Sequence, residues 1–158
     1  MRSAAAVLVL AALLGGCSLF PSLSGQGPAE PPPLGAAVVP PGQMTLNVSN
    51  GSTLDVALVV NGTPIGTPIP AGQGTGLVAG DLPSLPWNVE VRSPSGRVLV
   101  SADVHAGDVW SRPVGGGGTE SKGVGARVDL SCGRIDIWSG FPMSGPVPGP
   151  GTPGDCAP

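Results

Sequence analysis

Aromatic and charged side chains are scarce in this chain of 158 residues. Only 3% of the residues are aromatic, tyrosine is absent, and charged residues make up 11%. Aliphatic side chains therefore supply most of the apolar surface, and each buries less area than an aromatic ring would. The formal net charge is −3 at pH 7, so the chain lacks the basic surface that neutralises nucleic-acid phosphates. We expect one modest core and no nucleic-acid partner.

Histidine occurs once, as His105, and this scarcity excludes most metal chemistry. A blue-copper site needs two histidines and a cysteine, commonly with an axial methionine. The chain offers His105, Cys132 and either Met44 or Met143, which is one histidine short. A structural zinc site is excluded in the same way, because the chain has too few cysteine and histidine ligands. The Asp-x-Asp-x-Asp-Gly pattern of a calcium-binding loop is also absent. We expect no metal and no cofactor.

A catalytic site centred on His105 is an alternative that the sequence leaves open. Asp103, Asp108, Ser101 and Ser111 lie within a few residues of this histidine. Close neighbours along a strand mostly point apart, so a Ser–His–Asp chain of hydrogen bonds is not expected there. The sequence favours a protein that is not an enzyme, with no catalytic residues. The alternative is an accessory or weak hydrolytic enzyme built on His105.

The first seventeen residues are the most informative part of the chain. Residues 4–14 carry no polar side chain, and the sequence Leu14-Gly15-Gly16-Cys17 follows at their end. The apolar run is too short for the roughly 20 residues of a membrane-spanning helix. It fits the apolar region of a secretory signal, which takes about 7 to 15 residues. The segment resembles the signal peptide and lipobox of bacterial lipoproteins.

The resemblance implies that residues 1–16 are removed and that Cys17 receives a thioether-linked diacylglycerol, with a further acyl chain possible on the new amino group. Each buried methylene is worth about 0.8 kcal/mol, so two or three acyl chains hold durably. The protein is therefore expected to be exported and anchored to a bacterial membrane, with its domain extracytoplasmic. Ser18 stands where an aspartate would suggest inner-membrane retention, and the sequence leaves open the cell membrane and the outer membrane.

Proline and glycine cluster near the two ends of the chain and mark the domain boundaries. Residues 17–42 are expected to form the lipid anchor and a Pro-rich tether, since prolines with almost no charge favour extended polyproline geometry. Residues 36–39 are alternatively a first strand. Residues 142–158 alternate proline with glycine and serine and should be irregular. The domain is therefore assigned to residues 43–141.

Apolar and polar residues alternate with a period of two through that domain. The clearest alternation, at residues 87–92, pairs with residues 98–102 as a predicted hairpin. Asn50-Gly51 and Asn61-Gly62 have the chemistry of hairpin turns, and two prolines make residues 63–69 an edge strand or a loop. Residues 71–76 and 115–118 are expected to be turns or loops. The pattern indicates an all-β fold, a small antiparallel β-sandwich of about seven strands, immunoglobulin-like or similar.

The last apolar segment changes phase at Gly133. Val128, Leu130 and Cys132 share one parity, whereas the isoleucines after Gly133 share the other. Either Gly133 makes a β-bulge or residues 131–133 form the tip of a hairpin, and the bulge is slightly favoured. In both cases the charged side chains nearby are expected on solvated faces: Arg127, Asp129, Arg134 and Asp136.

Cysteine count and tryptophan position complete the site predictions. With Cys17 assigned to lipid, Cys132 and Cys156 remain as one possible disulfide, which would tie the tail to the last strand; two free thiols are the alternative. Trp87 shares the parity of its apolar neighbours and should be buried. Trp138 and Trp110 are the candidates for binding a partner, an envelope protein or a glycan. The sequence thus predicts a lipid-anchored extracytoplasmic envelope protein with a non-catalytic binding or structural module.

Overall fold

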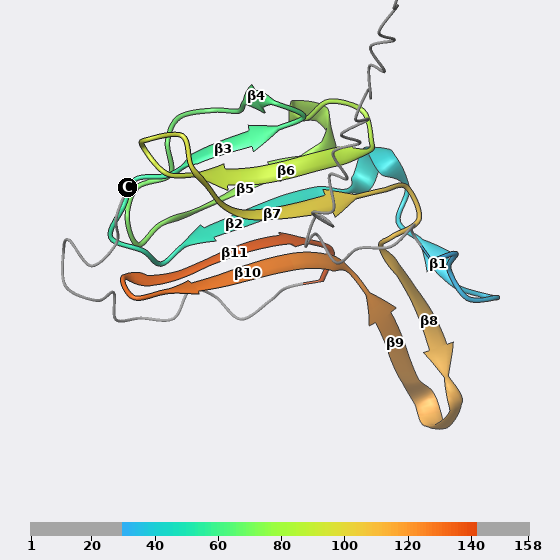
Figure 1. Ribbon diagram of the computed structural model, residues 1–158. Coiled ribbons are helices and arrows are strands. Elements are labelled where there is room, and N and C mark those ends of the chain that lie inside the picture. Colours follow the sequence, from blue (N-terminus) through green and yellow to red (C-terminus); the bar gives the residue numbers. More distant parts are fainter. Residues whose placement is uncertain (1–29, 142–158) are drawn as a thin grey trace, which may run out of the picture.

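The computed structural model describes residues 30–141, which form an all-β fold (Figure 1). Two four-stranded antiparallel sheets pack face to face as a small β-sandwich, and a third sheet of three strands projects from it. The predicted fold class is confirmed, although these residues form eleven strands where about seven were expected. Within the same residues, no helix has the length and apolar character needed to cross a bilayer.

The two sheets of the sandwich draw their strands from distant parts of the sequence. One sheet has the order β10 (Val124–Leu130), β11 (Gly133–Ser139), β2 (Thr45–Asn50) and β5 (Gly74–Val78). The other has the order β4 (Thr63–Pro64), β3 (Ala57–Val60), β6 (Trp87–Arg92) and β7 (Val98–Val104). The Pro-containing strand β4 lies at an edge, as predicted, and pairs only with β3. Proline has no N–H to donate, so Pro64 is tolerated where no further strand pairs with β4.

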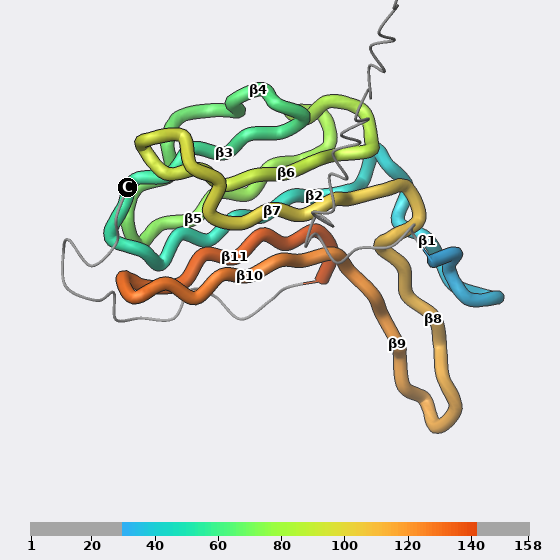
Figure 2. Tube along the Cα trace, viewed as in Figure 1, coloured from blue at the N-terminus to red at the C-terminus, as the bar shows by residue number. Residues whose placement is uncertain are grey.

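The third sheet consists of β1 (Ala37–Val38), β8 (Trp110–Val114) and β9 (Gly118–Lys122). Strands β8 and β9 form a hairpin, here called the arm, which extends away from both sheets of the sandwich (Figures 1 and 2). The short 3-10 helix at Gly115–Gly117 forms its tip. Strand β1 confirms the alternative in which residues 36–39 contain a strand. A polar strand, β9, starts in the segment that was expected to be a loop.

Aliphatic side chains fill the space between the two sheets. Trp87 is 1% exposed, as predicted, and its indole N–H donates a 2.7 Å hydrogen bond to the Pro83 carbonyl. Full burial of a Val, Leu or Ile side chain is worth about 1.5–3 kcal/mol, and many such side chains compensate for the lack of aromatic rings. Members of this core from both sheets include Leu46, Val48, Leu58, Val60, Val89, Val91, Val104, Ile135 and Ile137.

The two Asn-Gly pairs of the sequence have different roles. Asn61 and Gly62 have φ angles of 50° and 78° and form the predicted hairpin turn, between β3 and β4. The prediction of a hairpin turn at Asn50-Gly51 is wrong, because β2 and β3 belong to different sheets. Asn50 is instead a fully buried residue at the end of β2, where the chain crosses from one sheet to the other.

The side chain of Asn50 holds this crossing together. Its amide nitrogen lies 2.7 Å from the Leu54 carbonyl, 3.0 Å from that of Ile69 and 3.1 Å from that of Pro70. Its oxygen accepts hydrogen bonds from the Ser52 amide at 3.1 Å and the Ser52 hydroxyl at 2.6 Å. These contacts join the end of β2 to three other parts of the backbone, and they give the buried Ser52 amide its acceptor. The Ile69 and Pro70 carbonyls also accept backbone hydrogen bonds, from Val56 at 3.0 Å and from Gln73 at 3.1 Å.

The phase change near Gly133 is a hairpin, so the favoured bulge is wrong. Leu130 pairs with Gly133 and Val128 with Ile135, which reverses the chain direction and keeps both apolar sets on the core side. Gly133 has a φ of 125°, and a Cβ added there would overlap the Gly51 carbonyl. Glycine is therefore required on both grounds.

The expectation that the charged residues of this hairpin are solvated is wrong for Asp136. The carboxylate is 4% exposed and accepts hydrogen bonds from Arg127 at 2.5 Å and from Arg134 at 3.1 Å. The Arg134 side chain is itself only 12% exposed. A buried carboxylate requires such charge-assisted donors. The antiparallel register brings Arg127 opposite Asp136, and Arg134 lies two residues before Asp136 on the same strand.

Candidate functional site

The residues assigned to lipid and disulfide lie mostly outside the described part of the chain. Cys17 and Cys156 both fall outside residues 30–141. Cys132 lies in the turn between β10 and β11 and is fully buried. The lipidation and the pairing of Cys132 with Cys156 therefore stay predictions.

His105 lies on the connection from β7 to β8, with its side chain 45% exposed. The Asp108 carboxylate accepts a 2.7 Å hydrogen bond from the His105 amide and lies 3.3 Å from the ring nitrogen Nδ1. Asp103 instead accepts a hydrogen bond from Asn88. Among the described residues no serine hydroxyl bonds to the His105 ring, so Ser101 and Ser111 are not brought to it. Those residues also contain no cluster of three or more potential metal-ligating side chains.

Trp138 lies on the outer face of its sheet, opposite in direction to the buried Ile137. The ring is half-buried because it rests on Gly123 and Gly125; a Cβ added at either glycine would overlap it. Its indole N–H is enclosed and has no hydrogen-bond partner among the described residues. The parity argument placed Trp138 on the correct face, but the two glycines lower its exposure.

Trp110 forms the floor of a groove at the base of the arm. The Arg112 guanidinium lies 5.9 Å from the centre of the Trp110 ring, within the range of a cation–π contact. Arg112 also donates a 2.6 Å hydrogen bond to Glu120 on the neighbouring strand. The groove has a volume of about 360 Å³ and is lined by Glu30, Pro31, Pro33, Trp110, Arg112, Glu120 and Lys122. The residues before β1 thus close one wall of it.

Sequence reasoning selected Trp110 but missed its surroundings. Trp110 is only 7% exposed, so its ring supports the groove while the polar side chains around it face outward. Glu120 and Lys122 come from β9, a strand that the sequence pattern did not reveal. The alternation of Glu120 and Lys122 along β9, together with Arg112 on β8, was the signal that could have indicated the groove.

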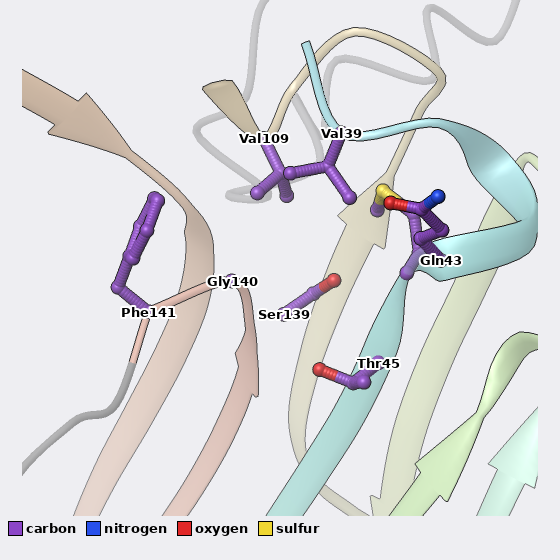
Figure 3. Close-up of a pocket in the computed structure, with 8 residues that line it drawn as sticks. Val39, Gln43, Thr45, Val109, Ser139, Gly140 and Phe141 are labelled. Carbon is purple, nitrogen blue, oxygen red and sulfur yellow. The ribbon is translucent and has the colours of Figure 1, made fainter. Parts of the chain in front are cut away.

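A second hollow, smaller and mostly apolar, lies at the end of β11 (Figure 3). Its volume is about 180 Å³. Phe141, 40% exposed, lies on one side, and Val39 and Val109 lie on another. Ser139 lies in the middle of the view, with Thr45 below it. The Ser139 hydroxyl is buried without a hydrogen-bond partner among the described residues. No sequence pattern indicated this cleft, because three distant segments contribute to it.

The groove and the cleft differ in what they can bind. The groove offers cationic, anionic and aromatic groups together on a projecting hairpin, whereas the cleft offers apolar walls and two hydroxyls. In comparisons with known protein families, curated proteins and solved structures, nothing matches the chain. The functional argument therefore depends on the residues of the chain itself.

Proposed function

We propose that this protein is a lipid-anchored extracytoplasmic protein of the bacterial envelope whose β-sandwich is a non-catalytic binding module. The Leu14-Gly15-Gly16-Cys17 sequence supports the lipid anchor on Cys17. The observation that carries the binding function is the Trp110 groove, which is lined by the charged side chains of Glu30, Arg112, Glu120 and Lys122. The arm that carries most of the groove projects from the sandwich (Figure 1). The proposed partner is an envelope protein or a glycan, and the fold provides the rigid support.

The composition of the groove favours recognition of a partner. Trp and Arg are enriched among the residues that dominate binding energies at interfaces, and Arg112 lies over the Trp110 ring. Lys122 makes no ion pair within residues 30–141, so its ammonium is available to a partner's acidic group. Arg112 and Glu120, each more than one-third exposed, hold the charged surface in a fixed arrangement.

The hydrolytic alternative has less support. His105 would need a hydroxyl nucleophile and an orienting carboxylate in one hydrogen-bonded chain. Asp108 supplies a carboxylate, but the described residues bring no hydroxyl to the ring, and His105 lines neither the groove nor the cleft. A binding module therefore accounts better for the arrangement.

Changing Arg112 to alanine is expected to reduce capture of the envelope partner by about tenfold, because a charge-assisted contact and the cation–π contact are both lost. The measurement is quantitative pull-down of the full-length protein from envelope extract. Arg97→Ala is the matched control, since this arginine lies at the other end of β7 from the arm. Equal capture by the Arg112 and Arg97 variants would contradict the assignment of the groove as the binding site.

We also propose that Cys132 pairs with Cys156. Strand β11 spans seven residues between the Cys132 turn and the start of the tail, or about 23 Å at 3.3 Å per residue. The tail from residue 142 to 156 can reach about 50 Å, which is ample for the return. In the chain-entropy account the disulfide contributes roughly 3 kcal/mol to stability.

Alkylation in denaturant without reductant tests the pairing. The wild-type protein is expected to show no reactive thiol, whereas Cys156→Ser should expose one, at Cys132, and lower the free energy of unfolding by roughly 3 kcal/mol. Ser131→Ala, in the same turn as Cys132, is the control for local packing. Two reactive thiols in the wild-type protein would exclude the disulfide.

A further inference from the structure

The two edges of the arm are protected unequally. On one side β1 covers the base of β8, pairing at Ser111 and Trp110, and farther out β8 carries Pro113, which has no N–H to offer. On the other side, within residues 30–141, no strand pairs with the outer edge of β9, and β9 contains no proline. An open edge of this kind is a template for pairing with another chain.

The backbone groups at the open edge can be assigned from the ladder. In an antiparallel pair, successive residues turn their N–H and C=O groups alternately toward and away from the partner strand. The Val39 N–H donates a 2.9 Å hydrogen bond to the Val109 carbonyl, just before β8. The backbone groups of odd-numbered residues in β8 therefore face β1, and those of even-numbered residues face β9. Since Arg112 lies opposite Glu120, Glu120 faces β8. Thr119 and Ser121 therefore face outward.

We infer that the outer edge of β9 pairs with the same edge of a second copy of this chain, in an antiparallel ladder whose two-fold axis passes between the two Ser121 residues. In that register Glu120 lies opposite Lys122 of the partner subunit, and Lys122 lies opposite Glu120 of the partner subunit. A shift of two residues either way places Glu120 opposite Glu120 or Lys122 opposite Lys122. The alternation of backbone groups allows only such even shifts, so charge selects the first register.

The proposed pairing extends an ion pair that the arm already contains. Arg112, Glu120 and Lys122 share one face of the arm, since they alternate along paired strands. Arg112 and Glu120 of one chain would be followed, across the two-fold axis, by Lys122 of the partner subunit, so that positive and negative charges alternate along the row. The two-fold symmetry produces the same row a second time, with the two chains exchanged. A two-stranded hairpin is marginally stable in water, and the second copy would convert it into the centre of a six-stranded sheet of β1, β8 and β9 from each chain.

The contact is small, because only five residues of each β9 take part. Interfaces of low buried area are characteristic of weak and transient association. If the proposed lipid anchor holds both copies in one membrane, their effective concentration rises, as it does for tethered partners. The pairing uses Glu120 and Lys122, which also line the Trp110 groove, but it does not depend on the lipid anchor. The cross-link at Ser121 reports the pairing separately from capture of an envelope partner.

Cysteine cross-linking in envelope membranes containing the full chain tests the register. Residues of a hydrogen-bonded antiparallel pair have Cα atoms about 5.5 Å apart, a separation that a disulfide accepts. Ser121→Cys is therefore expected to give a covalent dimer on a non-reducing gel after mild oxidation. Thr119→Cys is the matched control, because Thr119 would face Gly123 of the partner subunit. Wild-type protein gives the background from native cysteines.

Two further changes distinguish pairing from random collision. Adding Lys122→Glu to Ser121→Cys places like charges opposite each other twice and should lower the cross-linked fraction by about tenfold, whereas Lys122→Arg should preserve it. Ser121→Pro removes the outward N–H that the pairing requires and fixes φ at a value that an edge strand tolerates. At protein concentrations at which the wild-type chain dimerises in sedimentation, this variant should stay monomeric while circular dichroism is unchanged. Equal cross-linking at positions 119 and 121, or no effect of Lys122→Glu, would overturn the inference.

Discussion

Replacing Cys17 with serine is expected to move the protein from the membrane fraction to the soluble extracytoplasmic fraction. Serine offers no thiol for the thioether bond, so the diacylglycerol is not attached. At about 0.8 kcal/mol for each buried methylene, loss of two acyl chains removes essentially all membrane affinity. The chain has no excess of basic residues to replace it. Fractionation and intact-mass analysis of the mature protein measure the effect.

The matched control for this experiment is Ser18→Ala, which alters the adjacent residue but keeps the thiol. It should retain the lipid mass and stay in the membrane fraction. A Cys17→Ser protein that still sediments with vesicles, with its hydrophobic mass unaltered, would contradict the proposed anchor.

Replacing Asn50 with alanine is expected to lower the free energy of unfolding by about 3 to 5 kcal/mol. The change removes all hydrogen bonds of a side chain that is fully buried. The Ser52 amide would lose its acceptor, and an unsatisfied buried group costs about 1–3 kcal/mol. The hydrogen bonds to the Leu54, Ile69 and Pro70 carbonyls would also be lost, at about 0.5–1.5 kcal/mol each. Denaturant unfolding followed by circular dichroism gives the measurement.

Two further variants define the cause of this loss. Asn47→Ala, on the solvent-facing side of the same strand, should change the free energy of unfolding by less than about 0.5 kcal/mol. Asn50→Asp keeps the acceptor toward Ser52 but loses the donors, so it should destabilise at least as much as alanine. If Asn50→Ala unfolds at the wild-type denaturant concentration, the side chain does not hold the crossing between sheets.

Strands with a clean alternation could be predicted from the sequence. Residues 87–92 bury Trp87, Val89 and Val91 on one face, and they pair with β7 as the pattern indicated. Two strands could not be predicted in this way. Strand β5 consists largely of glycine and small residues, and β9 is polar on both faces. Their apolar pattern is too weak, and pairing with neighbouring strands fixes them instead.

Tertiary partners decided the positions that were wrongly predicted. Asn50-Gly51 and Asn61-Gly62 are the same dipeptide, yet only the second is a hairpin turn. Asn50 differs from Asn61 because its side chain donates hydrogen bonds to the carbonyls of Ile69 and Pro70, which lie 19 and 20 positions further along the chain. Likewise, the buried Asp136 carboxylate is paired with Arg127, which the hairpin register places opposite it, and with Arg134 two residues away on its own strand.

The candidate site was predicted only in part. Trp110 was selected because it is a large side chain in a chain with few aromatics, and the structure places it on the floor of the groove. The rest of the groove depends on the pairing of β8 with β9 and on residues 30–33 lying beside them. Such proximity has no periodic signal, so a single sequence does not reveal it.

The placement of the three tryptophans gives the molecule its own optical probes. Trp87 is enclosed in the sandwich, Trp110 lies beneath a guanidinium at the arm, and Trp138 rests on glycines at an outer surface. Since tyrosine is absent, ultraviolet emission comes almost wholly from these indoles, each in a distinct environment. Single-indole variants would let fluorescence follow the sandwich, the hairpin and the sheet surface separately without an added dye.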